Sequence, residues 1–217
     1  MTTAAPKPKP RLRGVSHEIA CYVAVVASAV LIAAAPSGLP TLAATVYGIC
    51  LSALFAISAA YHRPTWQPQA RQRMRRLDHA GIFFQIAGTY TPICLLAVGG
   101  EPGQRTFLLI WAGAALGVVK SLLWVHAPKP LTALLYVLLS WGAVSEWTVV
   151  SAAIGPQGVA LLLVGGVLYT VGALVYAVRR PDPVPHVFGY HEVFHVLVVA
   201  AAACHFALVY RVVWAGR

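Results

Sequence analysis

The chain has 217 residues, of which 59% are hydrophobic and only 10% charged, and its mean hydropathy is +0.73. A soluble domain of this length needs far more charge to cover its surface, so the composition excludes that class. The net charge of +10 does not indicate nucleic-acid binding, because the basic residues stand in short segments between apolar runs. The composition therefore predicts a multi-pass protein of the cell membrane, with membrane lipids as its partners.

Along the chain, residues 1–16 come first and are rich in Pro, Lys and Arg, which predicts a disordered basic cytoplasmic tail. Apolar runs of about 20 residues then recur, each long enough to span a bilayer. Turn-forming segments rich in Gly and Pro separate them. Residues 17–217 are therefore predicted to form one all-α domain, a seven-transmembrane-helix bundle. The predicted spans are 18–36, 41–62, 78–98, 106–125, 131–150, 157–178 and 190–213.

The basic residues also predict the orientation of the bundle. With a cytoplasmic N-terminus, the N-terminal tail and the second, fourth and sixth connections carry twelve Lys and Arg residues. The opposite side carries three. Because cytoplasmic loops are enriched in Lys and Arg, the N-terminus is predicted to be cytoplasmic and the C-terminus outside.

Four ionisable residues are predicted to lie at one membrane depth. His62 ends the second span, Asp78 begins the third, and His191 and His195 begin the seventh. All four belong to the cytoplasmic ends of their spans. Such side chains cost about 2.5–3.5 kcal/mol each within a membrane, so their shared depth indicates a functional site.

The chemistry of these residues points to a metal. His191 and His195 are four residues apart, so on a helix they differ by only about 40° in direction and about 6 Å in height. Three neutral imidazoles with an open position suit Zn²⁺ in a catalytic arrangement. Asp78 is then either a fourth ligand or, as we favour, a group that orients a bound water molecule. An H-x-x-x-H pattern in an apolar helix also arises from hydrogen bonding between helices, and that alternative stays open.

The same residues stand in four separated motifs. These are Ser58-Ala-Ala-Tyr-His62, Arg76-Leu-Asp78-His-Ala-Gly-Ile82, Gly88-Thr-Tyr-Thr-Pro92 and His191-Glu-Val-Phe-His195. With these motifs in this order, the chain resembles the hemolysin III branch of the progestin and adipoQ receptor family over nearly its whole length.

The resemblance implies a seven-helix bundle with a zinc site on the cytoplasmic side. By motif, the ligands are His62, His191 and His195. Asp78 is the carboxylate that contacts zinc through water, and Ser58 is a hydrogen-bond partner of the bound water or substrate.

The chain departs from the family at the start of its first span. Many relatives carry a Glu and an Asn shortly before a His, whereas here Arg13-Gly-Val-Ser precedes His17. The role of His17 is therefore left open. His205 lies about 15 Å from His195 along the helix axis, so it is interpreted as a cavity-lining residue, with simple packing as the alternative. The remaining histidines, His79, His126 and His186, are assigned no role.

Three functions remain as hypotheses. The first is metal-dependent hydrolysis of an amide or ester in a membrane lipid that enters between helices, with Asp78 as general base and Ser58 positioning the oxygen. The wider superfamily's link to ceramide-type amide hydrolysis supports it by analogy. The second is a non-catalytic sensor or regulator of membrane lipid state in which zinc is structural. The third is a cytolysin or pore.

Overall fold

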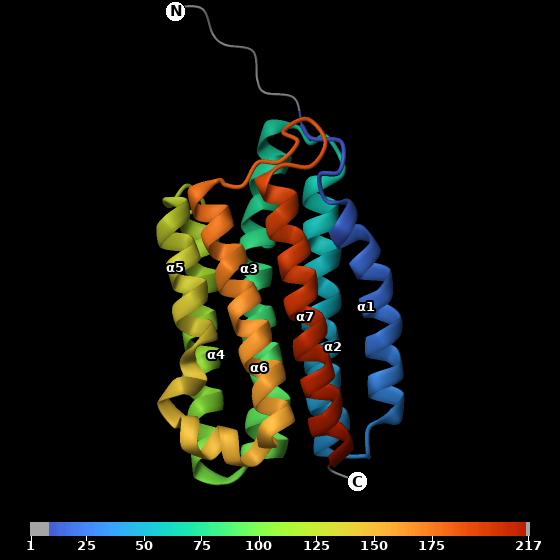
Figure 1. Cartoon of the computed structure of the whole chain (residues 1–217), viewed down its shortest axis with the longest axis vertical. Coiled ribbons are helices and arrows are strands. Elements are labelled where there is room, and N and C mark those ends of the chain that lie inside the picture. Colours follow the sequence, from blue (N-terminus) through green and yellow to red (C-terminus); the bar gives the residue numbers. More distant parts are fainter. Residues whose placement is uncertain (1–8, 216–217) are drawn as a thin grey trace, which may run out of the picture.

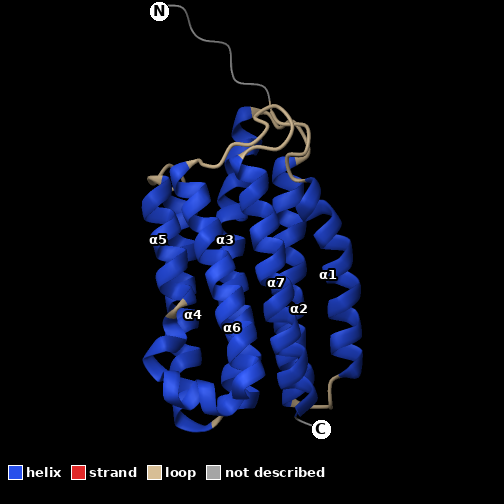
Figure 2. Ribbon diagram, in the orientation of Figure 1, coloured by secondary structure: helices blue, strands red, loops and turns tan. Residues whose placement is uncertain are grey.

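Helices account for nearly all of the computed structural model, which describes residues 9–215 (Figure 2). This agrees with the predicted all-α class, while residues 1–8 of the predicted tail lie outside the described residues. Two short segments, the π-helix η1 (Ile93–Val98) and the 3₁₀-helix η2 (Gly142–Glu146), interrupt the α-helices. The α-helices are α1 (Val15–Ala34), α2 (Leu39–His62), α3 (Pro68–Pro92), α4 (Gly100–Leu123), α5 (Lys129–Ser140), α6 (Trp147–Val178) and α7 (Tyr190–Ala215).

Six helices of the described chain are long and apolar enough to cross a membrane: α1, α2, α3 continued by η1, α4, α6 and α7. They coincide with six of the predicted spans. Their outward faces carry exposed large hydrophobic side chains, such as Val23 and Leu123. Lipid is the solvent that such faces require.

The predicted span 131–150 is the exception, because it is not one helix. α5 ends at Ser140, η2 follows, and α6 begins at Trp147. The break falls at Gly142, a residue with low helix propensity, and Glu146 at its end pairs with Arg105 of α4. Gly155 (φ 66°) kinks α6 just before Pro156, in the segment that separates the predicted spans 131–150 and 157–178.

Close packing between neighbouring helices depends on small residues. Consecutive helices lie side by side, and α7 also contacts α1, α2 and α3 (Figure 1). At the α2–α3 interface, a Cβ atom added to Gly88 would lie 2.6 Å from the Cβ of Cys50. Small side chains allow helix backbones to approach closely in lipid. The central position of α7 brings its first turns next to the first turn of α1, the last turn of α2 and the cytoplasmic half of α3.

Residues 9–16, which precede or open the first helix, make contacts that a disordered tail would lack. The backbone amides of Arg11 and Leu12 donate hydrogen bonds to the carbonyl groups of His186 and Val187, in the loop before α7. The Lys9 Nζ atom donates to the carbonyl oxygen of Arg63, at the end of α2 (2.6 Å). The predicted disorder therefore does not extend over residues 9–16, because these residues find backbone partners in two other segments.

Candidate metal centre

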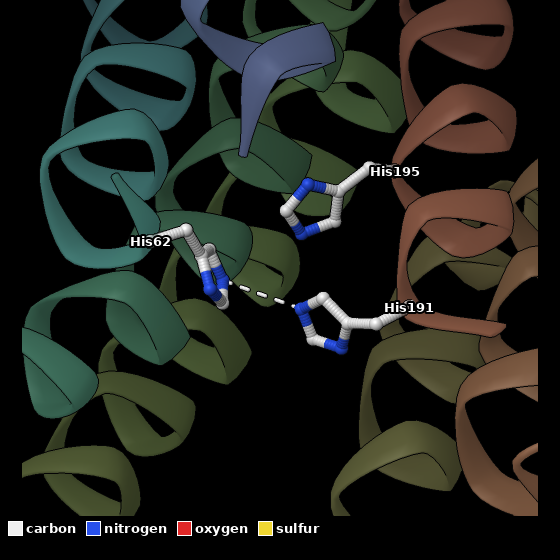
Figure 3. Close-up of side chains that lie close together, drawn as sticks. All are labelled: His62, His191 and His195. Atoms are coloured by element: carbon white, nitrogen blue, oxygen red, sulfur yellow. Dashed lines mark hydrogen bonds between the residues drawn. The ribbon is translucent and has the colours of Figure 1, made fainter. Parts of the chain in front are cut away.

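Three histidines from two helices converge at the end of the bundle that carries the N-terminus. His62 ends α2, and His191 and His195 lie in the first two turns of α7 (Figure 3). One nitrogen from each ring can be chosen so that all three lie within 4.8 Å of one another, and the three side chains are buried. The four-residue spacing and the common depth inferred from the sequence are both present here.

The nitrogen atoms of this cluster could hold a metal ion. The Nε2 atoms of His62 and His191 are 3.3 Å apart. Two ligands of one tetrahedral ion with bonds of about 2.0–2.1 Å are separated by about 3.3 Å. His195 Nδ1 is buried and has no hydrogen-bond partner among the described residues. In Figure 3, the Nε2 atom of His195 faces the other two rings and the Nδ1 atom points away from them, so Nε2 is the atom of this ring that could bind an ion between the three histidines.

Asp78 and Ser58 lie beside the histidines. The Asp78 Oδ2 atom is 3.8 Å from His62 Nε2. This separation is too long for a direct hydrogen bond and leaves room for a bridging water molecule. Ser58, one turn before His62 on α2, is buried and its hydroxyl interacts with the Asp78 carboxyl group. The structure thus places Asp78 and Ser58 beside the three histidines.

His17 is a member of the site whose role the sequence left open. Its ring stacks on that of His195, with centroids 3.8 Å apart and planes 5° apart. Its Nδ1 atom hydrogen-bonds with the Ser58 hydroxyl (2.8 Å). The indication in the sequence was its depth, because His17 opens the first span at the same end as the other histidines. It therefore connects a candidate ligand to the candidate oxygen-positioning residue.

The residues that replace the family's Glu and Asn support the same site. A Cβ atom added to Gly14 would lie 2.7 Å from the Cβ of His62, so only glycine allows this approach. Arg13 forms an ion pair with Glu192, which is almost fully buried between the two histidines of α7. Glu192 also accepts a hydrogen bond from the Gly189 amide (2.8 Å), which caps the start of α7. Residues 13 and 14 therefore contact both helices that carry the three histidines.

Two cavities meet at this site. The first, the apolar cavity, runs inside the bundle from Ser58, Asp78 and His195 to His205, and most of its lining is apolar. His205 thus lines a cavity, as expected. The second, the basic vestibule, has a volume of ≈ 270 Å³ and lies on the other side of Asp78. It is lined by Arg13, Tyr61, His62, Arg71, Arg75, Asp78, His79, Ile82, Lys129, Ala133, Tyr136, Ala173, Tyr176, Tyr190, His191 and Phe194.

Of the histidines assigned no role, one lies near the site. His79 lines the basic vestibule, and its backbone carbonyl accepts a hydrogen bond from the Tyr136 hydroxyl (3.2 Å). His126 is exposed and hydrogen-bonds with Gln72, and His186 is also exposed.

The apolar helices and the polar site at one end of the bundle define a multi-pass membrane protein. The model of the family described as haemolysin-III related matches residues 6–206 of the chain. The chain therefore belongs to the haemolysin III family, within the progestin and adipoQ receptor group, and in bacteria such a protein resides in the plasma membrane.

Characterised relatives are similar over most of their length. Hemolysin-3 of Bacillus cereus is 28% identical over 195 residues, which cover 88% of this chain and 86% of the relative. The hemolysin-3 homolog of Bacillus subtilis is 27% identical over 162 residues, covering 75% and 73% of the two chains. The human monocyte to macrophage differentiation factor is 25% identical over 203 residues, covering 90% and 81%.

Proposed function

We propose that this protein is a zinc-dependent hydrolase that cleaves an amide or ester bond in a membrane lipid. The observation that carries the proposal is the buried cluster of His62, His191 and His195 beside Asp78, where the apolar cavity meets the basic vestibule. A lipid chain requires an apolar space, and hydrolysis requires water. The apolar cavity would hold the chain, and water would reach the site through the more polar vestibule.

Zinc is the metal that suits three neutral imidazoles with an open coordination position. His62, His191 and His195 would hold it. When bound, zinc supplies a Lewis acid that polarises a carbonyl group and lowers the pKa of water to about 7.

The neighbouring side chains carry the proton transfers. In hydrolysis, the oxygen of water bonds to the acyl carbon, the bond from that carbon to nitrogen or oxygen breaks, and the leaving amine or alcohol gains a proton. Asp78 accepts the proton from water and passes it to the leaving group. The Ser58 hydroxyl positions the attacking oxygen, and His17 holds that hydroxyl by its hydrogen bond. The lipid enters between helices, and its acyl chain then occupies the apolar cavity.

The proposed protein crosses the membrane seven times. α5 and η2 together would provide a seventh crossing, with the N-terminus cytoplasmic and the C-terminus outside. The support is the excess of Lys and Arg at the end of the bundle that carries the site, and the position of the two termini at opposite ends (Figure 1). Labelling of single introduced cysteines in intact cells tests this. Reagent access to residue 216 but not to residue 5 is expected, and the reverse pattern contradicts it.

Zinc content and lipid hydrolysis, measured on the same purified variants, test the function. His62→Ala should lose zinc, and His126→Ala, which changes an exposed histidine, should retain it. Asp78→Asn should keep its zinc and lose about 10²–10⁴-fold in hydrolysis rate, the range for a general base. Unchanged zinc in His62→Ala would contradict the metal site. Unchanged hydrolysis in Asp78→Asn would contradict the assigned base.

A second candidate function is a sensor of membrane lipid state in which the metal is structural. It is favoured by one feature, that the cluster joins the end of α2 to the start of α7. Under this alternative Asp78→Asn is silent in every lipid assay, whereas His62→Ala lowers the melting temperature. The effect of Asp78→Asn on lipid hydrolysis therefore distinguishes the two candidates.

A further inference from the structure

The basic vestibule concentrates positive charge next to the metal centre. Its lining includes four cationic side chains, Arg13, Arg71, Arg75 and Lys129, from the tail, α3 and α5. Asp78 is the only carboxylate among its lining residues. A metal ion held by neutral histidines would add further positive charge.

Most of this charge is not neutralised by the protein. Arg13 pairs with Glu192, and Lys129 donates a hydrogen bond to the uncharged Tyr190 hydroxyl (3.0 Å). Within residues 9–215, no ion pair joins Arg71, Arg75 or Lys129 to a carboxylate. A cleft lined by one sign of charge attracts a ligand of the opposite sign.

The orientation of the protein in the membrane does not account for this arrangement. A cytoplasmic excess of Lys and Arg explains why cations lie at this end of the bundle, but not why four of them surround one cavity. Arg73, Arg179 and Arg180 lie at the same end and are exposed, as Arg71 is, but they do not line the vestibule. Arg71 and Arg75, by contrast, are four residues apart and so lie on one face of α3.

The vestibule adjoins the apolar cavity. Both are lined by Asp78, Ile82, Tyr136, Ala173 and Phe194. From this junction the apolar cavity extends to His205, which lies about 15 Å from His195 along α7. A ligand that fills both spaces needs an apolar chain on one side of Asp78 and an anionic group on the other.

We infer that the basic vestibule binds a phosphate group in the headgroup of a lipid whose acyl chain occupies the apolar cavity. Phosphate fits because arginine forks bind its oxygens with paired hydrogen bonds and lysine adds a point charge. The assignment rests on the proposed function and narrows its substrate to phosphate-bearing lipids. The bond to be cleaved then lies between headgroup and chain, beside Asp78.

Binding of non-hydrolysable probes tests the inference separately from hydrolysis. The zinc-loaded, full-length protein is placed in nanodiscs of zwitterionic lipid. The probes are a fluorescent single-chain ether lipid with a glycerol phosphate headgroup and the same lipid without its phosphate. We expect the phosphorylated probe to bind about tenfold more tightly, because at least one charge-assisted contact distinguishes the two. Equal affinities would overturn the inference.

Matched variants locate the contact. Arg71→Gln combined with Arg75→Gln should abolish the preference for the phosphorylated probe, and Arg73→Gln should leave it unchanged. An equal loss in Arg73→Gln would overturn the inference, because it would show a general effect of surface charge. Lys129→Gln removes a cation from a different helix and should reduce the preference, so the inference can be tested even if the double variant does not fold.

Soluble competitors distinguish the two sources of phosphate. Inorganic phosphate and glycerol 3-phosphate should displace the probe only at far higher concentrations than the unlabelled lipid phosphate. Displacement at similar concentrations would overturn the lipid assignment in favour of a soluble phosphate compound. A preference for phosphate without hydrolysis of any lipid would contradict the proposed function alone, whereas hydrolysis without a preference would contradict this inference alone.

Discussion

The two ends of the bundle use the same structural devices for different purposes. Each end has an ion pair and a glycine with positive φ. At the site end, the pair Arg13–Glu192 is largely buried, with side chains 22% and 2% exposed. At the far end, the exposures of Arg105 and Glu146 are 58% and 18%. The same interaction therefore supports the candidate metal ligands at one end and lies near water at the other.

The glycines differ in the same way. Gly14 (φ +81°) lies directly against His62, while an added Cβ at Gly38 (φ +90°), in the turn between α1 and α2, would meet nothing within 4 Å. Both positions favour glycine for its backbone conformation. Only Gly14 is also required by a neighbouring side chain. Changes at the site end should therefore affect both metal binding and stability. Matched changes at the far end should affect stability only weakly, or affect stability without affecting metal binding.

Removal of the metal should have the largest effect. A ligand present at about 1,000 times its Kd stabilises the folded state by about 4 kcal/mol, so a chelator should lower the melting temperature markedly. Hydrogen exchange should accelerate at the start of α7 and remain unchanged at the start of α4. His62→Ala should already melt early and not respond to the chelator. Equal acceleration at both ends would contradict a local role for the metal.

The second largest effect is expected from the difference in stability contribution between the two ion pairs. Glu192→Gln leaves Arg13 without its buried partner and should cost about 3 kcal/mol of unfolding free energy. Glu146→Gln removes a partner from the more exposed Arg105 and should cost at most about 1 kcal/mol. Denaturation of the two variants in detergent measures the difference, and raised salt should narrow the effect of Glu146→Gln. Similar costs would show that burial does not separate the two pairs.

The glycine pair should give the smallest effects. Gly38→Ala should cost about 1 kcal/mol through backbone strain. Gly14→Ala adds the overlap with His62 and should cost about 2 kcal/mol, and it should also weaken zinc binding. Zinc titration of both variants provides the check. A loss of zinc affinity in Gly38→Ala would remove the distinction between the two ends.

Depth in the membrane could be predicted from the sequence with some success. Because spans are long apolar runs, their ends can be located along the chain, and His62, Asp78, His191 and His195 all fall at ends that face one side of the membrane. Six of the predicted spans coincide with long apolar helices. His17 lies at the same membrane depth as these residues, although the sequence left its role open.

Direction around each helix axis could not be predicted in the same way, because lipid-facing and buried positions are both apolar in a membrane protein. Hydrophobicity along the sequence therefore does not show that the face of α2 carrying His62 packs against Gly14. It also did not show that the run 131–150 breaks at Gly142, because an apolar run is equally consistent with a continuous helix and a broken one.

Local composition and spacing along single helices were enough to predict the class of protein, six long apolar helices and the residues able to bind a metal. Only the packing of the helices shows that the histidine rings converge, that His17 stacks on His195, and that two cavities lie beside Asp78. These features depend on how helices distant in sequence rotate and pack against one another. That packing is set by many small contacts, which no single segment encodes.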